Sequence, residues 1–226
     1  MCLMPGAYAT AIFGPASGTM DRMGIRHVLF DADGVLQDLP GGWYAAMEPY
    51  LGDRAREFLH ETWVEELPSL AGQEDYLPIL TAGLRRHGAT ASVTEIYDAV
   101  WKKISVIEES LEVVRALKRN GYGVHLGTNQ ECYRGAHMRT ALGYDELFDV
   151  SCYSYDLGVA KPDPDFFTRA ANRIGADPET ILFIDDNPDN VTAAHTAGLP
   201  AERWDFTQGH ATLHTLLTTH GVAIQP

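Results

Sequence analysis

Positive charge is scarce in this chain of 226 residues. Only 17 Lys and Arg residues stand against 31 Asp and Glu, which gives a formal net charge of −14. Nucleic acids and anionic membranes bind basic surfaces, so we expect neither as a partner. A small anionic substrate stays possible, because a bound divalent cation can dominate the local field.

Cysteine and the usual hydrolase signatures are also sparse. The chain has three cysteines, an odd number, with no Cys-x-x-Cys pair. A disulfide framework is therefore not expected, and a reducing cytoplasm is the plain interpretation. The sequence contains no Gly-x-Ser-x-Gly elbow, which argues against a serine hydrolase. None of its nine histidines forms a metal-ligand pair with a plausible neighbour.

The first 24 residues differ in composition from the rest, with Gly, Ala, Pro and Met dominating. Their apolar patch, residues 7–13, is too short to span a bilayer, and no basic segment precedes it. We expect residues 1–24 to form a loosely ordered extension. Residues 25–38 and 107–226 are expected to form an α/β core, and residues 39–106 an all-helical insert without a strand.

Short apolar runs alternate with helical patterns over most of the remaining chain. The pattern predicts strands at 27–30, 124–126, 150–153 and 181–184. Predicted helices lie at 53–67, 75–87, 92–101, 108–120, 132–142, 163–174 and 207–220. A further helix is predicted from the acidic segment at 185–187 to residue 197. Alternating strands and helices predict an α/β fold with a Rossmann-like, doubly wound parallel sheet, interrupted by the helical insert.

Four groups of polar residues lie at the ends of the predicted strands or in the loops that follow. In open α/β sheets, ligands bind at the carboxyl ends of the strands, so residues placed there are candidates for chemistry. The groups are Asp31 and Asp33; Thr128 and Asn129; Lys161; and Asp185 and Asp186.

Each group taken alone has a simpler interpretation. Asp31-x-Asp33 fits a turn with solvated carboxylates; an EF-hand calcium loop is rejected, since its register puts Pro40 where a carboxylate is needed. Thr128-Asn129 fits a helix N-cap pair, and Lys161 an exposed lysine before a helix. Two adjacent acids ending an apolar strand, 185 and 186, repel each other and need a cation or donors nearby.

Together, the four groups resemble the motifs of the haloacid dehalogenase-like (HAD) superfamily. The resemblance covers roughly residues 25 to 205. It rests on four segments in order: Phe30-Asp-Ala-Asp-Gly-Val35, Gly127-Thr-Asn129, Gly158-Val-Ala-Lys-Pro-Asp-Pro164 and Phe183-Ile-Asp-Asp-Asn-Pro-Asp-Asn190. The helical insert after the first motif is similar to the family's C1-type cap.

The resemblance implies a Mg²⁺-dependent phosphatase that cleaves a small phosphate monoester through an aspartyl-phosphate. Asp31 would be the nucleophile, and Asp33 the general acid and base. The implied Mg²⁺ ligands are Asp31, the backbone carbonyl of Asp33 and Asp186, with Asp185 nearby. The phosphoryl oxygens would be held by Thr128, Asn129 and Lys161.

Three alternatives remain beside the phosphatase. Dehalogenating members of the superfamily lack an acid at the position of Asp33, so that activity ranks low. A sugar-phosphate mutase on the same core stays open, as does a non-catalytic binding protein. The expected partner is a small phosphorylated metabolite, and the protein is expected to be a monomer or homodimer.

The insert would select the substrate. Gly41 and Gly42 suit one hinge, and the segment around Ser105 suits the other. Trp43 or Tyr44 is expected to line the entrance to the site, because both follow the nucleophile closely.

Overall fold

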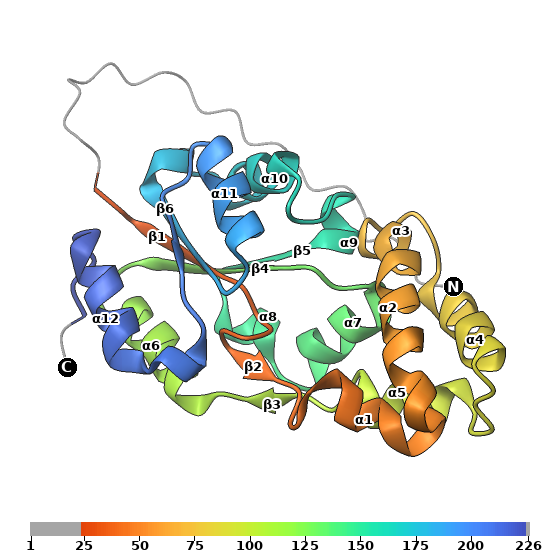
Figure 1. The fold of residues 1–226 in the computed structure, drawn as a ribbon. Coiled ribbons are helices and arrows are strands. Elements are labelled where there is room, and N and C mark those ends of the chain that lie inside the picture. Colours follow the sequence, from red (N-terminus) through yellow and green to blue (C-terminus); the bar gives the residue numbers. More distant parts are fainter. Residues whose placement is uncertain (1–23, 225–226) are drawn as a thin grey trace.

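A five-stranded parallel sheet with the strand order β5-β4-β1-β6-β7 forms the centre of the computed structural model, which describes residues 24–224 (Figure 1). The strands are β1 His27–Phe30, β4 Gly123–Thr128, β5 Val150–Tyr153, β6 Ile181–Asp185 and β7 Ala201–Arg203. The predicted parallel α/β sheet is confirmed. β7 was not predicted, because three residues with only Ala201 fully buried leave no periodic signal.

Helices cover both faces of this sheet. Side chains alternate across β1, so that Val28 and Phe30 enter one hydrophobic cluster and Leu29 the other. The first cluster is closed by α6 Glu108–Arg119 and α12 His210–Thr219, and the second by α10 Pro164–Ile174 and α11 Pro188–Thr196 (Figure 1). Burial on both faces explains why the central strands are almost wholly apolar.

The order of the strands fixes where a ligand can bind. From β1 in the centre, the chain continues to β4 and β5 on one side and later to β6 and β7 on the other. This reversal leaves a crevice at the carboxyl ends of the central strands. Asp31 and Asp33 leave β1 at that edge.

The inserted helices pack around a hydrophobic cluster of their own. They are α1 Gly42–Leu51, α2 Ala55–Glu65, α3 Leu67–Leu70, α4 Tyr76–Arg86 and α5 Val93–Val100, with the 3₁₀ turn η1 Gly52–Arg54. Two predicted helix starts are confirmed: Asp75 accepts a hydrogen bond from the amide of Leu77, and Ser92 from that of Glu95. The division of the chain into core and insert stays a prediction.

Two expectations for the insert are wrong. The region was expected to lack strands, yet β3 Ser105–Val106 pairs antiparallel with β2 Gln37–Asp38. The helix predicted over residues 53–67 has Trp63, Val64 and Leu67 among the apolar residues of its expected buried face, yet they are 51%, 62% and 55% exposed, and Leu67 begins α3. The buried stripe instead passes through Thr62, which lies one helical turn after the buried Phe58.

Shorter elements complete the core. They are α7 Cys132–Thr140, α8 Tyr144–Leu147, α9 Ser154–Leu157 and the 3₁₀ turns η2 Pro178–Thr180 and η3 Phe206–Gln208. Helices of one turn were missed because four residues carry no period. Residues 1–23 of the expected extension lie outside the described part. Within residues 24–224, no helix is long and apolar enough to cross a membrane.

Candidate active site

The predicted polar residues meet at the carboxyl edge of the sheet. Asp31 directly follows β1, Thr128 ends β4 and Asp185 ends β6. The backbone amide of Asp31 donates to the carbonyl of Ile184 over 2.9 Å, which fixes the start of the loop against β6. Lys161 reaches the same edge from the loop between α9 and α10.

Lys161 lies between two carboxylates at the centre of the site. Its Nζ is 2.8 Å from Asp31 Oδ1 and 2.7 Å from Asp185 Oδ2, and it also donates to the carbonyl of Gly127 over 3.0 Å. The Lys161 side chain is 1% exposed, so the ammonium exchanges water for these three oxygens. The simpler interpretation of Lys161, an exposed lysine before a helix, is therefore wrong.

For both Asp31 and Lys161, burial and the charge of the partner act on the pKa in opposite directions. Burial raises the pKa of Asp31 to about 8, even though Lys161 acts to lower it, and the charge of Asp185 adds to the rise. Burial alone would lower the pKa of Lys161, but the carboxylates of Asp185 and Asp31 outweigh it and raise that pKa. The ammonium is therefore held in its charged form.

Three carboxylates in this crevice are close enough to share a cation. Asp31, Asp185 and Asp186 each present an oxygen, and these oxygens lie within 4.8 Å of one another. Burial, and then the charge of Asp185, raise the pKa of Asp186. Carboxylate oxygens are the ligands that Mg²⁺ prefers, so the donor set fits this ion.

Gly34 lets the loop after β1 approach Asp186. Its φ of +81° lies in the left-handed region, and a Cβ placed there would lie 2.9 Å from Asp186 Cγ. A larger residue would therefore be strained and would also push against the carboxylate.

Asp185 is held by its own loop as well as by Lys161. Its Oδ1 accepts from the backbone amide of Asn187 over 2.8 Å, and the amide of Asn190 donates to both Asp185 oxygens over 3.1 and 3.0 Å. With its oxygens so occupied, Asp185 is less free than Asp186 to bind a further group. Asn190 thus supports the acidic pair from α11.

Thr128 and Asn129 do not cap a helix. The N-cap of α7 is Glu131, whose carboxylate accepts from the amides of Tyr133 and Arg134. The Asn129 side chain instead bonds the backbone of Lys161 twice: its Nδ2 donates to the carbonyl over 2.8 Å, and its Oδ1 accepts from the amide over 2.9 Å. Asn129 therefore fixes the lysine loop. The buried Thr128 hydroxyl accepts from Gln130 over 3.0 Å.

Asp33 is bound by residues that the sequence reasoning missed. Arg134 donates from Nη1 to Asp33 Oδ2 over 2.6 Å and from Nη2 to Oδ1 over 2.7 Å. Gln37 and Gln130 add bonds of 3.0 and 2.8 Å to the same carboxylate. Burial favours the neutral acid, but Arg134 outweighs it and lowers the pKa of Asp33 to about 2.

A sequence signal for Arg134 did exist. It lies four residues before the fully buried Met138 on α7, so both side chains share the inner face of that helix. A basic residue on an inward helix face needs a buried acid as partner. Gln37 gave no comparable signal, because it lies in β2, a strand of only two residues without a period.

The insert also contributes groups near Asp33. Trp43 contacts Arg134, whose guanidinium carbon lies 5.8 Å from the ring centroid, and packs on Trp101 with ring centroids 5.5 Å apart. Burial, and then the charge of Glu131, raise the pKa of Glu66 to about 8, with Arg134 and Asp33 also close enough to act on it. Tyr44 stacks under Arg56 instead. Whether Trp43 or Tyr44 lines an entrance stays a prediction.

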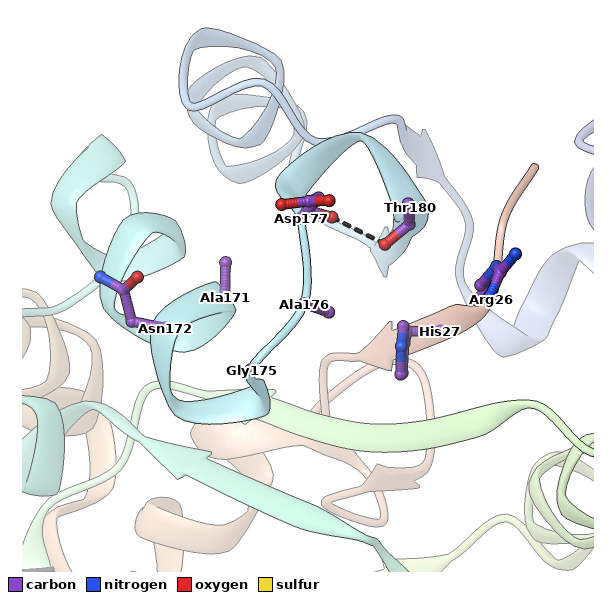
Figure 2. A pocket seen from close by; sticks show the side chains of 8 residues that line it. All are labelled: Arg26, His27, Ala171, Asn172, Gly175, Ala176, Asp177 and Thr180. Carbon is purple, nitrogen blue, oxygen red and sulfur yellow. Dashed lines mark hydrogen bonds between the residues drawn. The ribbon is translucent and has the colours of Figure 1, made fainter. Parts of the chain in front are cut away.

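A second hollow lies away from these groups. This cavity has a volume of about 440 Å³. Figure 2 shows the residues that line it, among them Arg26, His27, Asn172, Asp177 and Thr180. His27 begins β1 and Thr180 precedes β6, so the hollow is at the amino ends of strands whose carboxyl ends carry the aspartates. Size alone does not make it the reactive site, since the acidic cluster lies at the opposite edge.

Comparisons with known proteins agree with this geometry. A family model described as haloacid dehalogenase-like hydrolase matches residues 25–198. A phosphoglycolate phosphatase of Yersinia pestis is 27% identical over 209 residues, with 87% of each chain covered. A phosphatase of phosphorylated carbohydrates from Thermotoga maritima is 25% identical over 180 residues, covering 76% of this chain and 81% of the relative.

Solved structures share the fold at lower identity. A HAD family enzyme of Bacteroides thetaiotaomicron, in complex with magnesium and inorganic phosphate, superposes with a TM-score of 0.65 at 23% identity, covering 80% of this chain and 94% of that one. A predicted HAD-like hydrolase of Porphyromonas gingivalis gives a TM-score of 0.71 at 23% identity, covering 86% and 98%.

Proposed function

Because this chain belongs to the haloacid dehalogenase-like hydrolase family, we propose that it is a Mg²⁺-dependent phosphatase that hydrolyses a small phosphate monoester through an aspartyl-phosphate. The observation that carries the proposal is the meeting of Asp31, Lys161 and the acidic pair at one edge of the sheet. Phosphatases among the relatives support it.

The acidic cluster would hold the metal ion. Asp31, Asp186 and the backbone carbonyl of Asp33 are the ligands we propose, with Asp185 beside them and held by Lys161. Mg²⁺ bound there would neutralise the phosphate that the net negative charge of the protein would otherwise repel.

Asp31 would be the nucleophile. Its carboxylate oxygen forms a bond to phosphorus while the bond from phosphorus to the ester oxygen breaks. Asp33 gives a proton to that leaving oxygen, because the negative charge of the bound ester opposes the effect of Arg134 and raises the pKa of Asp33. Water then attacks the same phosphorus, Asp33 takes the proton from the water, and the bond to Asp31 breaks to release inorganic phosphate.

The remaining groups would orient the phosphoryl oxygens. Lys161 already bonds Asp31, so its ammonium is placed to bind a phosphoryl oxygen beside the nucleophile. The Thr128 hydroxyl lies at the end of the neighbouring strand and would do the same. For Asn129 we propose binding of the phosphate through the backbone amide, since its side chain is engaged by Lys161.

The inserted helices would act as a cap over this site. Trp43, Trp101 and Glu66 come from the insert and lie near Arg134 or Asp33. Closing them over a bound ester would exclude water from the aspartyl-phosphate until the leaving group departs. We further propose a free small metabolite as substrate and the cytoplasm as the location, consistent with an odd number of cysteines and no Cys-x-x-Cys pair in the sequence.

Hydrolysis of p-nitrophenyl phosphate tests the proposal. The purified protein should release p-nitrophenol with Mg²⁺ and stop when EDTA is added. Asp31→Asn should abolish turnover, whereas Asp189→Asn, at an exposed position of α11, should leave it unchanged. Full turnover by Asp31→Asn would remove the aspartyl-phosphate mechanism.

A panel of phosphorylated metabolites then separates the alternatives. Release of inorganic phosphate identifies a phosphatase, and an isomeric phosphate ester identifies a mutase. Binding of an ester without either product identifies a non-catalytic protein.

A further inference from the structure

Arg134 connects Asp33 with the inserted helices. The residue is 5% exposed, and its guanidinium has partners on two sides. Two of its nitrogens bind both oxygens of Asp33, and Nη1 also donates to Gln130 Oε1 over 2.6 Å. Its Nε donates over 2.8 Å to the backbone carbonyl of Trp101, where the insert returns towards the core.

The first turn of α7 contacts the insert at two further points. The Tyr97 hydroxyl of α5 donates to Glu131, the N-cap of α7, and both groups are buried. The Tyr133 hydroxyl donates to Asp75, the N-cap of α4, over 3.0 Å. Glu131 in turn accepts from the amide of Arg134 over 2.8 Å, so both the backbone and the side chain of Arg134 are linked to the insert.

The shape of the guanidinium makes this connection directional. Five N–H groups in one rigid plane fix the plane of a carboxylate that binds two of them. If the insert moved away, the Trp101 carbonyl would leave Nε, and a buried N–H without an acceptor is costly. The guanidinium would have to turn, and the Asp33 carboxylate would lose two of its four hydrogen bonds and keep only those from Gln37 and Gln130.

We propose that Arg134 is a positioning residue that sets the orientation of Asp33 according to the position of the insert. The inference rests on the function proposed above, in which Asp33 protonates the leaving oxygen. With the insert in the observed position, the carboxylate is held in one orientation. When the insert departs, the acid loses that orientation, so leaving-group protonation is restricted to the closed arrangement.

A pair of aryl esters of similar size provides the test. Phenolate is a much stronger base than p-nitrophenolate, so phenyl phosphate depends far more on a proton from Asp33. The value of kcat/KM includes only the steps up to departure of the leaving group, so later hydrolysis of the aspartyl-phosphate does not affect it. The ratio of kcat/KM for the two esters therefore reports the positioning of the acid.

Arg134→Lys keeps the charge but loses the planar fork. We expect it to lower kcat/KM for phenyl phosphate at least ~10-fold and that for p-nitrophenyl phosphate by less than ~3-fold, since general acid catalysis contributes ~100-fold or more. Arg139→Lys is the matched control: Arg139 lies on the same helix and pairs with Asp145 and Asp156, but has no bond to Asp33. It should leave the ratio unchanged.

Tyr97→Phe tests the link from the side of the insert. This change removes one hydroxyl, which contacts Glu131 and not Asp33. The inference can therefore still be tested if Arg134→Lys does not fold. The ratio should shift in the same direction by a smaller factor. Equal losses for both esters in Arg134→Lys, or an unchanged ratio in Tyr97→Phe, would overturn the inference. Absence of turnover by the unmodified protein would instead overturn the proposed function.

Discussion

Replacing Lys161 should show how strongly the acidic cluster depends on one ammonium. In Lys161→Met, two ion pairs of 2.8 and 2.7 Å are lost together, while the partner side chains Asp31 and Asp185 stay 11% and 0% exposed. Breaking a buried pair by removing one partner costs about 3 to 5 kcal/mol, so we expect the free energy of unfolding to fall by about 4 kcal/mol. For a chain of this size that corresponds to a drop in Tm of about 8 to 16 °C.

The matched control is Lys118→Met. Lys118 also bonds a carboxylate and a carbonyl, Asp149 at 2.9 Å and Leu147 at 2.6 Å, but its side chain and that of Asp149 are 33% and 42% exposed. Such surface pairs contribute about 0 to 1 kcal/mol. Urea unfolding of both variants in EDTA gives the comparison. A loss in Lys161→Met no larger than that in Lys118→Met would refute the reasoning.

Two conditions should reduce the loss in Lys161→Met. Mg²⁺ bound to the cluster would replace the missing positive charge, so the gap to the unmodified protein should narrow when it is added. A lower pH should also help. The pKa of Asp31 is raised to about 8 even with Lys161 present, so the folded state binds a proton that the unfolded state does not bind until about pH 4. The stability of the variant should therefore rise as the pH falls through this range.

Three further changes test other parts of the site. Gly34→Ala should lower the free energy of unfolding by ~1 to 2 kcal/mol because of its left-handed φ, and it should also weaken Mg²⁺ binding by displacing Asp186. Gly143→Ala is the control, with φ +67° and no atom within 4 Å of the added Cβ. It should lower the stability in urea unfolding but leave the Mg²⁺ titration unchanged. Glu66→Gln should raise the free energy of unfolding above that of the unmodified protein by ~2 kcal/mol more at pH 9 than at pH 5. The reason is that the pKa of Glu66 is raised from 4.5 to about 8, so the stability of the unmodified protein falls as the pH rises through that window; the figure is halved for residual exposure. An equal effect of the substitution on the unfolding midpoint at both pH values would contradict this prediction. Mg²⁺ at ~100 times its Kd should raise the free energy of unfolding by ~2.7 kcal/mol in calorimetry, and Asp186→Asn should lose most of that gain.

Much of the sheet and the placement of the site could be predicted from the sequence. The apolar strands that precede Asp31 and Asp185 are buried on both faces, and such runs are easy to identify. The parallel order then places residues at the strand ends near one another, wherever they lie in the chain. Helix starts at Asp75 and Ser92 were equally visible, because an N-cap is a local signal.

What could not be predicted depends on contacts distant in sequence. Arg134 meets Asp33 across 101 residues, and Gln37 bonds Asp33 from the two-residue strand β2, which is too short to show a period. The two-residue strands β2 and β3 exist only because the chain enters and leaves the insert side by side. Glu131, and not Thr128, is the N-cap of α7, because β4 extends through Thr128. Where a strand and a helix compete for the residues between them, the helix boundary is difficult to predict from the sequence.

The β2–β3 pair also bears on how this chain could be rebuilt. Asp38 and Ser105 face each other in an antiparallel ladder, so the ends of the whole intervening segment are only one strand spacing apart, ~4.8 Å. A two-residue Asn-Gly turn joins strands in that relation and could replace residues 39–104 without stretching the backbone. The intervening segment could therefore be exchanged for one of another length at this one strand pair, while the five-stranded sheet keeps its order.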